Sequence, residues 1–245
     1  MISVVIPTLN AQHSLAETMT SLVPAAVEGL VCEVIVADGG STDRTFDIAD
    51  GAGAEIVKAP SGRGAQLRAG AERARFPWLL FLNSGTYLDA GWERDAAQHI
   101  ERVGSGRRKA AAATFRFVLD DEGFGARLAE RMAAFRMGLL KLPYGDQGLL
   151  LPRTLYDEVG GFGALPLLED VDLARRLGRR RLAVLNARAV MDGERYRRDR
   201  TLTRTARAQA CLGLYLAGVP VKAIAAVFGS SQDRVGETIA ERGAS

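Results

Sequence analysis

The sequence predicts an α/β protein of the doubly wound type, with a mostly parallel sheet and helices on both of its faces. Through the first hundred residues, short apolar runs such as 31–37 and 78–82 alternate with segments of helical pattern. An apolar run without polar alternation is buried on both faces, which is typical of parallel strands covered by helices. Asp38 and Gly39 also follow directly after the run 31–37, at a strand's carboxyl end, where open α/β sheets bind their ligands.

The expected elements follow from the apolar runs and from the glycines and prolines that separate them. In the first half we expect strands at 2–6, 31–37, 55–58 and 78–82, with helices at 14–23, 44–52 and 65–75. In the second half we expect strands at 110–119, 149–151 and 182–185, with helices at 124–140 and 169–177. The helix at 124–140 is predicted from apolar residues at helical spacing, namely Leu128, Met132, Phe135 and Leu139.

Length and composition are those of a globular protein with a full core. The chain has 245 residues, of which 47% are apolar, and a formal net charge of +3, which does not demand a nucleic-acid partner. Cys32 and Cys211 have no metal-ligand neighbours in the sequence, and we expect them to be buried thiols in a reducing compartment. There is no basic leader region and no apolar stretch near about 18 residues, so we expect a cytoplasmic protein.

The segment after the second strand carries the first functional signal. Asp38 and two glycines are followed by Ser41, Thr42 and Asp43, which are residues that cap helix N-termini. A carboxylate is thus expected beside a flexible turn and a helix start, which is the outline of a nucleotide site. The alternative is that Asp38 only shapes the turn.

Four segments together resemble the family 2 glycosyltransferases, whose fold is called GT-A. They are residues 3–10, 34–43, 64–70 and 167–173, which read SVVIPTLN, VIVADGGSTD, GAQLRAG and LLEDVDL. They occur in the family's order within residues 1–190. The chain is most similar to the small bacterial subgroup annotated for arsenosugar biosynthesis, a resemblance that extends to 215–220.

The resemblance implies a GT-A domain at 1–190, with a nucleotide-binding half at 1–100 and an acceptor half at 101–190. The rest, 191–245, is expected to be a basic helical extension. The implied activity moves a sugar from a UDP- or GDP-linked donor to an acceptor hydroxyl with inversion. The implied nucleotide-binding residues are Pro7, Thr8, Asn10, Asp38, Gly39, Arg63, Gly64, Asn83 and Gly85. Among these, Arg63 is expected in a glycine loop, either clamping a phosphate or solvated at the surface.

The segment after the strand 78–82 departs from the family. Relatives carry an Asp-x-Asp motif that holds a divalent cation against the diphosphate, whereas this chain has Asn83, Ser84 and Gly85. Mg²⁺ and Mn²⁺ prefer anionic oxygen ligands, so the expected metal site is weak, with Asp89 as a candidate ligand in the following turn. Three alternatives remain open. Arginines alone neutralise the diphosphate, a metal binds through the substrate and Asp89 or another acid, or the protein binds sugar nucleotides without transferring them.

The late acidic motif supplies the candidate base. Glu169 and Asp170 open a predicted helix, and the resemblance implies that Asp170 deprotonates the acceptor, kept ionised by the helix dipole. The alternative is that Asp170 and Asp172 only complement the dipole and pair with arginines one turn away. Two further polar residues between glycines, Asp146 and Gln147, are candidate acceptor or sugar contacts, or else part of a turn without a ligand. His99 is expected at the surface of a charged helix.

The last part of the chain is basic. Residues 175–207 hold twelve arginines against three acids. Such a concentration suits the leaving diphosphate, an anionic or lipid-linked acceptor, or peripheral contact of the amphipathic stretch 208–216 with the anionic inner face of a membrane, although a solvated helical face has the same pattern. Residues 221–240 resemble a helix-turn-helix in apolar spacing, but acids on the expected second helix argue against nucleic acid.

Overall fold

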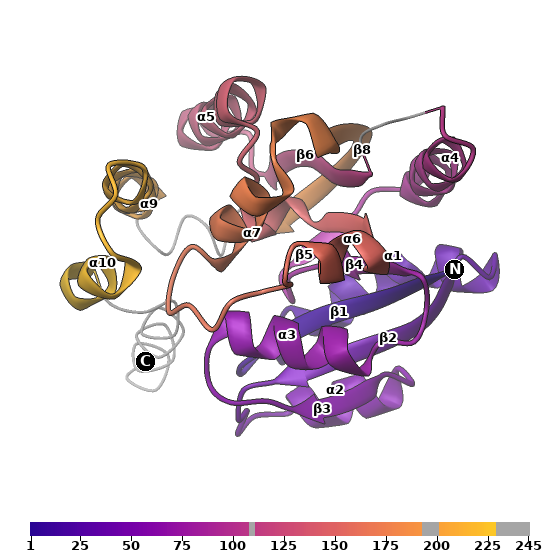
Figure 1. Cartoon of the computed structure of the whole chain (residues 1–245). Helices are drawn as coiled ribbons and strands as arrows, with labels where there is room; N and C mark the ends of the chain where they lie inside the picture. The colour runs from indigo at the N-terminus through magenta and orange to yellow at the C-terminus, as the bar shows by residue number, and fades with distance from the viewer. Residues whose placement is uncertain (108–110, 193–200, 229–245) are drawn as a thin grey trace.

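The computed structural model describes residues 1–107, 111–192 and 201–228. It has an eight-stranded mixed sheet in the order β3-β2-β1-β4-β7-β6-β8-β5, with helices on both faces (Figure 1). The strands are β1 (Ile2–Thr8), β2 (Val31–Asp38), β3 (Glu55–Lys58), β4 (Trp78–Phe81), β5 (Thr86–Leu88), β6 (Ala112–Asp120), β7 (Leu149–Pro152) and β8 (Leu182–Asp192). The fold class expected from the sequence is confirmed.

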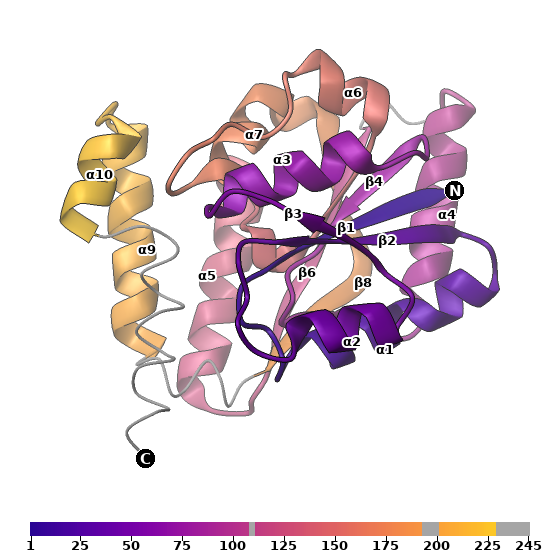
Figure 2. The same ribbon diagram turned by 90° about the horizontal axis from the view of Figure 1, so that it is seen from below.

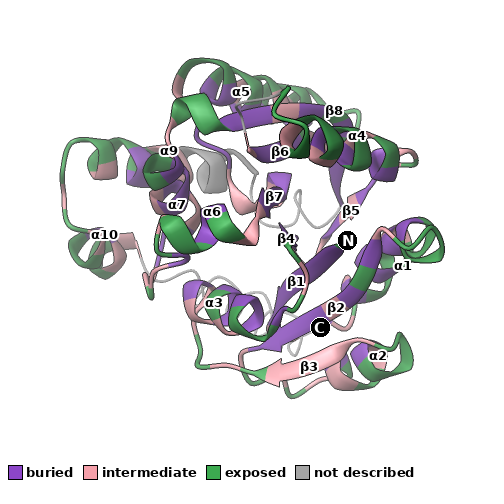
Figure 3. Ribbon diagram, turned by 45° about the vertical axis from the view of Figure 1, so that its right-hand side comes forward, coloured by how far each residue is buried: buried purple, intermediate pink, exposed green. Residues whose placement is uncertain are grey.

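The helices form two layers over buried strands (Figure 3). One apolar cluster joins the sheet to α1 and α4, and a second joins the opposite face to α3, α5, α6 and α7. The α-helices are α1 (Leu15–Val27), α2 (Thr45–Gly51), α3 (Arg63–Arg73), α4 (Trp92–Gly104), α5 (Phe124–Leu140), α6 (Arg153–Glu158), α7 (Glu169–Leu177), α9 (Thr201–Leu216) and α10 (Val221–Phe228), and the short 3-10 helices are η1 (Gly145–Gln147) and η2 (Arg179–Arg181).

The first half of the sheet is parallel, as expected. β1 lies between β2 and β4, and β3 continues the sheet beyond β2, all in parallel pairing. The carboxyl ends of β1, β2 and β4 therefore meet at one edge, which places Thr8, Asp38 and the residues after Phe81 near one another.

The second half is mixed, because β7 runs antiparallel between β4 and β6. The start of β7 therefore lies beside the end of β4, with Leu149 opposite Phe81. The loop 145–148, which precedes β7, is in this way brought to the same edge as the β1, β2 and β4 ends. The short strand β5, which pairs antiparallel with β8, was not among the expected elements.

Helix α3 begins earlier than its alanine-rich sequence predicts. Gly62 is the residue before the helix, with φ 131°, and Arg63 and Gly64 form the first turn. The expectation of a glycine loop around Arg63 is thus wrong. Gly64 is buried, and a Cβ there would lie 2.4 Å from the carbonyl oxygen of Gly163, so the helix start packs directly on the segment before α7.

Three side chains lie where sequence patterns did not predict them. His99 is 1% exposed, because the inner side of α4 holds it edge-on to the Trp78 ring at 5.9 Å. Cys32 is exposed near the start of β2, whereas Cys211 is buried. On α5, Phe135 is 70% exposed, so the apolar stripe that predicted this helix faces outward rather than toward the core.

Helices α9 and α10 pack beside α5 and α7 at one end of the molecule (Figure 2). Leu212 of α9 is buried with Val171 and Ala174 of α7, and Ile224 of α10 is buried with Leu167. The basic segment 193–200 and the second helix of the expected helix-turn-helix lie outside the described residues. Within the described ranges, no helix has the length and apolar character needed to cross a membrane.

Candidate active site

The carboxylate of Asp38 holds the loops after β1 and β2 together. It is 1% exposed and accepts hydrogen bonds from the Thr8 hydroxyl (2.9 Å), from the backbone N–H groups of Gly40 and Ser41 (both 2.8 Å) and from the Ser41 hydroxyl (2.5 Å). Four donors occupy the acceptor positions of a buried carboxylate. Asp38 therefore shapes its loop, as the turn alternative supposed, and its contact with a ligand stays a prediction.

Asn10 connects the same two loops. Its backbone N–H donates to the Ser41 hydroxyl at 2.8 Å, and its Oδ1 accepts the N–H of Thr42 at 2.9 Å. Asn10 has φ 51°, a left-handed conformation that asparagine tolerates better than most residues. Pro7 is buried at the end of β1, so a nucleotide would meet the backbone and the exposed polar groups of these loops rather than the Pro7 ring.

Gln66 on α3 was not predicted, although it anchors this half of the site. Its side-chain amide donates to the carbonyl oxygens of Thr8 (2.5 Å) and Ala37 (3.1 Å), and it is 4% exposed. A Cβ on Gly39 would lie 2.7 Å from Gln66 Nε2, so the glycine makes room for this amide. The sequence did hold a signal for the burial of Gln66. It is next to Leu67 and one helical turn before Gly70, and both of these residues lie on the buried side of α3.

Five of the predicted residues meet in one group joined by hydrogen bonds and ion pairs, which we call the Arg63 cluster: Arg63, Asn83, Asp146, Glu169 and Asp170. The two terminal nitrogens of Arg63 donate to Glu169 Oε1 at 2.8 Å and to Asn83 Oδ1 at 2.6 Å. The amide of Asn83 donates to Asp146 Oδ1 at 2.6 Å. Residues 106 positions apart in the chain are thus joined by α3, the β4 end and the start of α7.

The two acids of the late motif have different environments. Glu169 is 2% exposed and faces Arg63, whereas the Asp170 side chain is 16% exposed. Asp170 Oδ2 accepts the Gly145 N–H at 2.6 Å and lies 3.7 Å from Arg63 Nη1, and Oδ1 accepts the Val171 N–H at 2.7 Å. Of these two acids, only Asp170 is accessible to a substrate.

The charge of Arg63 is held by its acidic neighbours. Burial acts against the guanidinium charge, but the carboxylates of Glu169, Asp170 and Asp146 outweigh it and raise the pKa of Arg63 above its ordinary value. The cluster carries three carboxylates and one guanidinium, so it has no net attraction for a diphosphate. It suits neutral hydroxyls, which are the groups of a sugar or an acceptor.

A pocket opens beside the cluster between the β4 end, the η1 loop and α7. Its lining is mostly apolar, with polar groups from Arg63, Asn83 and Asp170, and the whole set is Arg63, Leu67, Phe81, Leu82, Asn83, Pro143, Tyr144, Gly145, Gly148, Leu149, Phe162 and Asp170. An apolar lining with a few convergent polar groups is usual for a small-molecule site, but the volume here is about 20 Å³, so a sugar would enter only if the walls moved apart. Burial raises the pKa of Tyr144 to about 12, and its hydroxyl donates to the Ala208 carbonyl of α9 at 3.3 Å.

Gln147 is a structural residue of the η1 turn. It is 3% exposed, its amide donates to the Phe115 carbonyl at 3.3 Å, and its Oε1 accepts the Tyr144 N–H at 3.3 Å. Of the two predicted acceptor contacts, Asp146 thus belongs to the Arg63 cluster, whereas Gln147 is turned into the fold. Sequence spacing alone does not separate two adjacent polar residues of this kind.

The residues at the position of the family's acidic motif do not fit a divalent cation. The side-chain oxygen of Asn83 accepts from Arg63, and its amide nitrogen donates to Asp146 Oδ1, so Asn83 presents no unused oxygen to a cation. Asp89 is paired with Arg188 of β8 at 2.7 Å and does not line the pocket. Throughout the described ranges, no three acidic, histidine or cysteine side chains gather as metal ligands would.

The sequence was compared with known proteins. It matches the model of the family described as Glycosyl transferase family 2 over residues 3–165, which is more than half of the chain. The chain belongs to glycosyl transferase family 2. This match spans β1 to the segment before α7, and it confirms the family expected from the motifs but not the arsenosugar subgroup.

Individual relatives agree with this assignment. Glycosyltransferase AglJ of Haloferax volcanii is 35% identical over 82 residues, which are 32% of this chain and 27% of AglJ, so the match spans about a quarter of that relative's length. Glucosyl-3-phosphoglycerate synthase from Mycobacterium tuberculosis, in complex with Mn²⁺, UDP-glucose and glycerol 3-phosphate, is similar in structure with a TM-score of 0.61 and 24% identity, over 90% of this chain and 81% of that one. The complex of the same enzyme with Mg²⁺ and UDP gives a TM-score of 0.53 and 23% identity, over 77% and 69%. At these identities the structural likeness shows the fold.

Proposed function

We propose that the protein transfers a sugar from a UDP- or GDP-linked donor to an acceptor hydroxyl with inversion, using Asp170 as the general base. The observation that carries this proposal is the placement of Asp170. It is the acid of the late motif that reaches the pocket, while Glu169 is buried against Arg63. A base must lie within hydrogen-bond reach of the hydroxyl that it deprotonates, and the position of Asp170 in the pocket lining supports this role for an acceptor that binds there.

The remaining roles follow from the same geometry. Arg63 and Glu169 position Asp170, and the Gly145 N–H fixes the orientation of its carboxylate. The deprotonated acceptor oxygen attacks the anomeric carbon of the donor sugar, the bond from that carbon to the diphosphate breaks, and the proton goes to Asp170. The donor's base and ribose are assigned to the loops after β1 and β2, which Asp38 and Gln66 hold in place.

The phosphates of the donor are not assigned to the Arg63 cluster. A phosphate reaching Arg63 would lie close to the carboxylates of Glu169 and Asp170, which contact the same guanidinium and would repel it. The structural relatives bind UDP together with Mn²⁺ or Mg²⁺, whereas Asn83, Ser84 and Gly85 offer no anionic oxygen. We therefore propose binding of the donor without a resident metal. We also propose that the chain belongs to the arsenosugar subgroup and that it is cytoplasmic.

The test is a donor panel combined with two matched variants. Purified protein is screened with UDP- and GDP-sugars for thermal stabilisation and for release of nucleoside diphosphate. Asp170→Asn should retain stabilisation by the donor and lose at least about a hundredfold in turnover, since general base catalysis contributes that much or more. Asp172→Asn is the control, because it lies on the same helix, pairs with Arg176 and does not line the pocket. Equal turnover in both variants would show that Asp170 is not the base.

A second candidate is a sugar-nucleotide binder without transfer activity. The observation in its favour is the neutral segment 83–85 at the position where relatives carry acids. This function predicts stabilisation by a nucleotide sugar with no nucleoside diphosphate released by the wild type, for any acceptor tried. Release of diphosphate that Asp170→Asn abolishes excludes it.

A further inference from the structure

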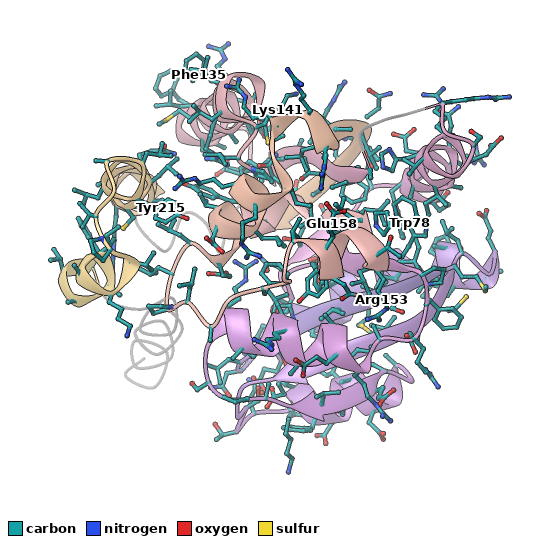
Figure 4. The ribbon with its side chains drawn as sticks, in the orientation of Figure 1. Trp78, Phe135, Lys141, Arg153, Glu158 and Tyr215 are labelled. Carbon is teal, nitrogen blue, oxygen red and sulfur yellow. The ribbon has the colours of Figure 1, made fainter. Side chains whose placement is uncertain are left out.

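Helix α5 presents its large apolar side chains to solvent. Phe124 is 85% exposed, Phe135 70%, Leu139 52% and Leu128 38%, whereas the buried side of the helix is mostly alanine. Figure 4 shows Phe135 on the side of α5 that faces away from the sheet. These four are among ten large apolar side chains that are exposed in the described residues. A helix that buries alanine and exposes phenylalanine is oriented for a partner rather than for the core.

The charges on this outer side are positive. Arg127 and Arg131 are exposed between the apolar residues, and Arg179 of η2 is held at the carboxyl end of the helix by the Leu139 carbonyl. Glu130, the acid of α5, is mostly buried and is turned to the Leu119 N–H and to Arg127. Asp120, Asp121 and Glu122 precede Phe124, so the positive part of this face runs from Leu128 to Leu139, beside Arg131 and Arg179. An apolar stripe with cations along it is complementary to an apolar surface that carries negative charge.

We propose that the outer face of α5, defined by Phe124, Leu128, Phe135 and Leu139 with Arg127 and Arg131, docks on a membrane surface that contains anionic lipid. The interfacial binding of such helices combines burial of the apolar side chains with attraction of the cations to acidic headgroups.

The α5 face is joined to the pocket by a short, well-anchored connection. Arg136, on the inner side of α5, donates to the Leu142 carbonyl at 2.8 Å and stacks over the Tyr144 ring at 3.6 Å. Tyr144 and Gly145 line the pocket. A docked α5 would therefore hold the pocket close to the membrane surface, within reach of an acceptor anchored in lipid. This assignment of the acceptor rests on the proposed function, whereas the docking of α5 does not.

The experiment measures vesicle binding of the whole protein without donor. Cosedimentation is compared for phosphatidylcholine vesicles and for vesicles in which about a third of the lipid is phosphatidylglycerol. The wild type should bind the anionic vesicles at least about tenfold more strongly, and added salt should weaken the binding. Phe124→Ser with Phe135→Ser should reduce it by about tenfold or more. Val27→Ser is the control, since Val27 is 82% exposed on α1 and should bind as the wild type does.

Other outcomes identify other occupants of this face. Absence of vesicle binding in the wild type overturns the proposal, as does equal binding by the serine variants of α5 and α1. A wild-type dimer in sedimentation that Phe135→Ser converts to a monomer would assign the face to a second copy. A marked loss of thermal stability in the α5 variant would show that another segment of the chain covers it. Donor stabilisation, measured in the same samples, reports separately on the proposed function.

Discussion

Replacing Arg63 by methionine tests the centre of the site. The substitution keeps an unbranched apolar stem but removes the guanidinium that Glu169 contacts at 2.8 Å. The Glu169 side chain is 2% exposed, so water cannot take the place of the lost countercharge. Removing one partner of a buried ion pair costs roughly 3–5 kcal/mol. Because the Arg63 side chain is itself 25% exposed, we expect the lower end, about 3 kcal/mol.

The assay is urea unfolding at neutral pH, followed by circular dichroism. Arg63→Met should lower the free energy of unfolding by about 3 kcal/mol, and the second change Glu169→Gln should restore a large part of it, because a neutral amide tolerates the site better than a carboxylate facing methionine. Arg188→Met is the matched control. It breaks the ion pair between Arg188 and Asp89. Because the Arg188 side chain is 56% exposed, the free energy of unfolding should fall by only about 0–1 kcal/mol. The reasoning is refuted if Arg63→Met costs no more than Arg188→Met, or if Glu169→Gln deepens its loss of stability.

Two further predictions concern pH and metal. Glu33 is buried, which opposes its charge, but hydrogen bonds from Ser3 and Arg75 outweigh burial and hold its pKa below the ordinary value. Its stabilisation is therefore present at neutral pH and is lost as pH falls through the lowered pKa. Glu33→Gln should lower the free energy of unfolding by about 1.5 kcal/mol at pH 7. In urea titrations, the difference between wild type and variant should become smaller below about pH 4.5. A difference that stays constant down to acid pH would contradict the lowered pKa of Glu33. For metal, calorimetry should give the same affinity for UDP after treatment with a chelator as with Mn²⁺ added, because residues 83–85 carry no carboxylate and Asp89 is paired with Arg188; loss of UDP binding on chelation would count against a site without a resident metal.

The parallel half of the fold was predictable because its signals are local. Each strand there is a continuous apolar run, and burial on both faces leaves that pattern in the sequence. The antiparallel placement of β7 has no such signal. Leu149, Leu150 and Leu151 would read the same in either direction, and only the pairing with β4 decides which end of the strand lies at the site.

Five of the predicted site residues meet in the fold, but the sequence did not predict which of them face the pocket. Glu169 and Asp170 are adjacent and chemically similar, yet one is turned toward Arg63 and the other reaches the pocket. Gln147 and Asp146 divide in the same way. The difference in each pair comes from tertiary packing at the start of a helix turn, which sequence spacing does not encode.

Helix α5 shows the limit of periodicity in another form. The spacing of its apolar residues correctly predicted a helix, because the period of a helix is visible in any amphipathic stripe. The spacing does not show which side of the helix packs on the sheet. The side opposite the apolar stripe does so, because its small alanine side chains allow α5 to approach the sheet closely.

Helix α3 connects the two halves of the site through the side chains of Arg63 and Gln66. Arg63 and Gln66 lie one turn apart, and they hold the acidic cluster and the loops after β1 and β2 respectively. A Cβ on Gly70 would lie 2.4 Å from Val5, so the body of the helix has no room to slide along the sheet. A ligand that pulls on Thr8 or Ala37 through Gln66 therefore tilts Arg63 as well. Amide hydrogen exchange should report this as protection at the start of α7 when only nucleotide is added, with no acceptor present.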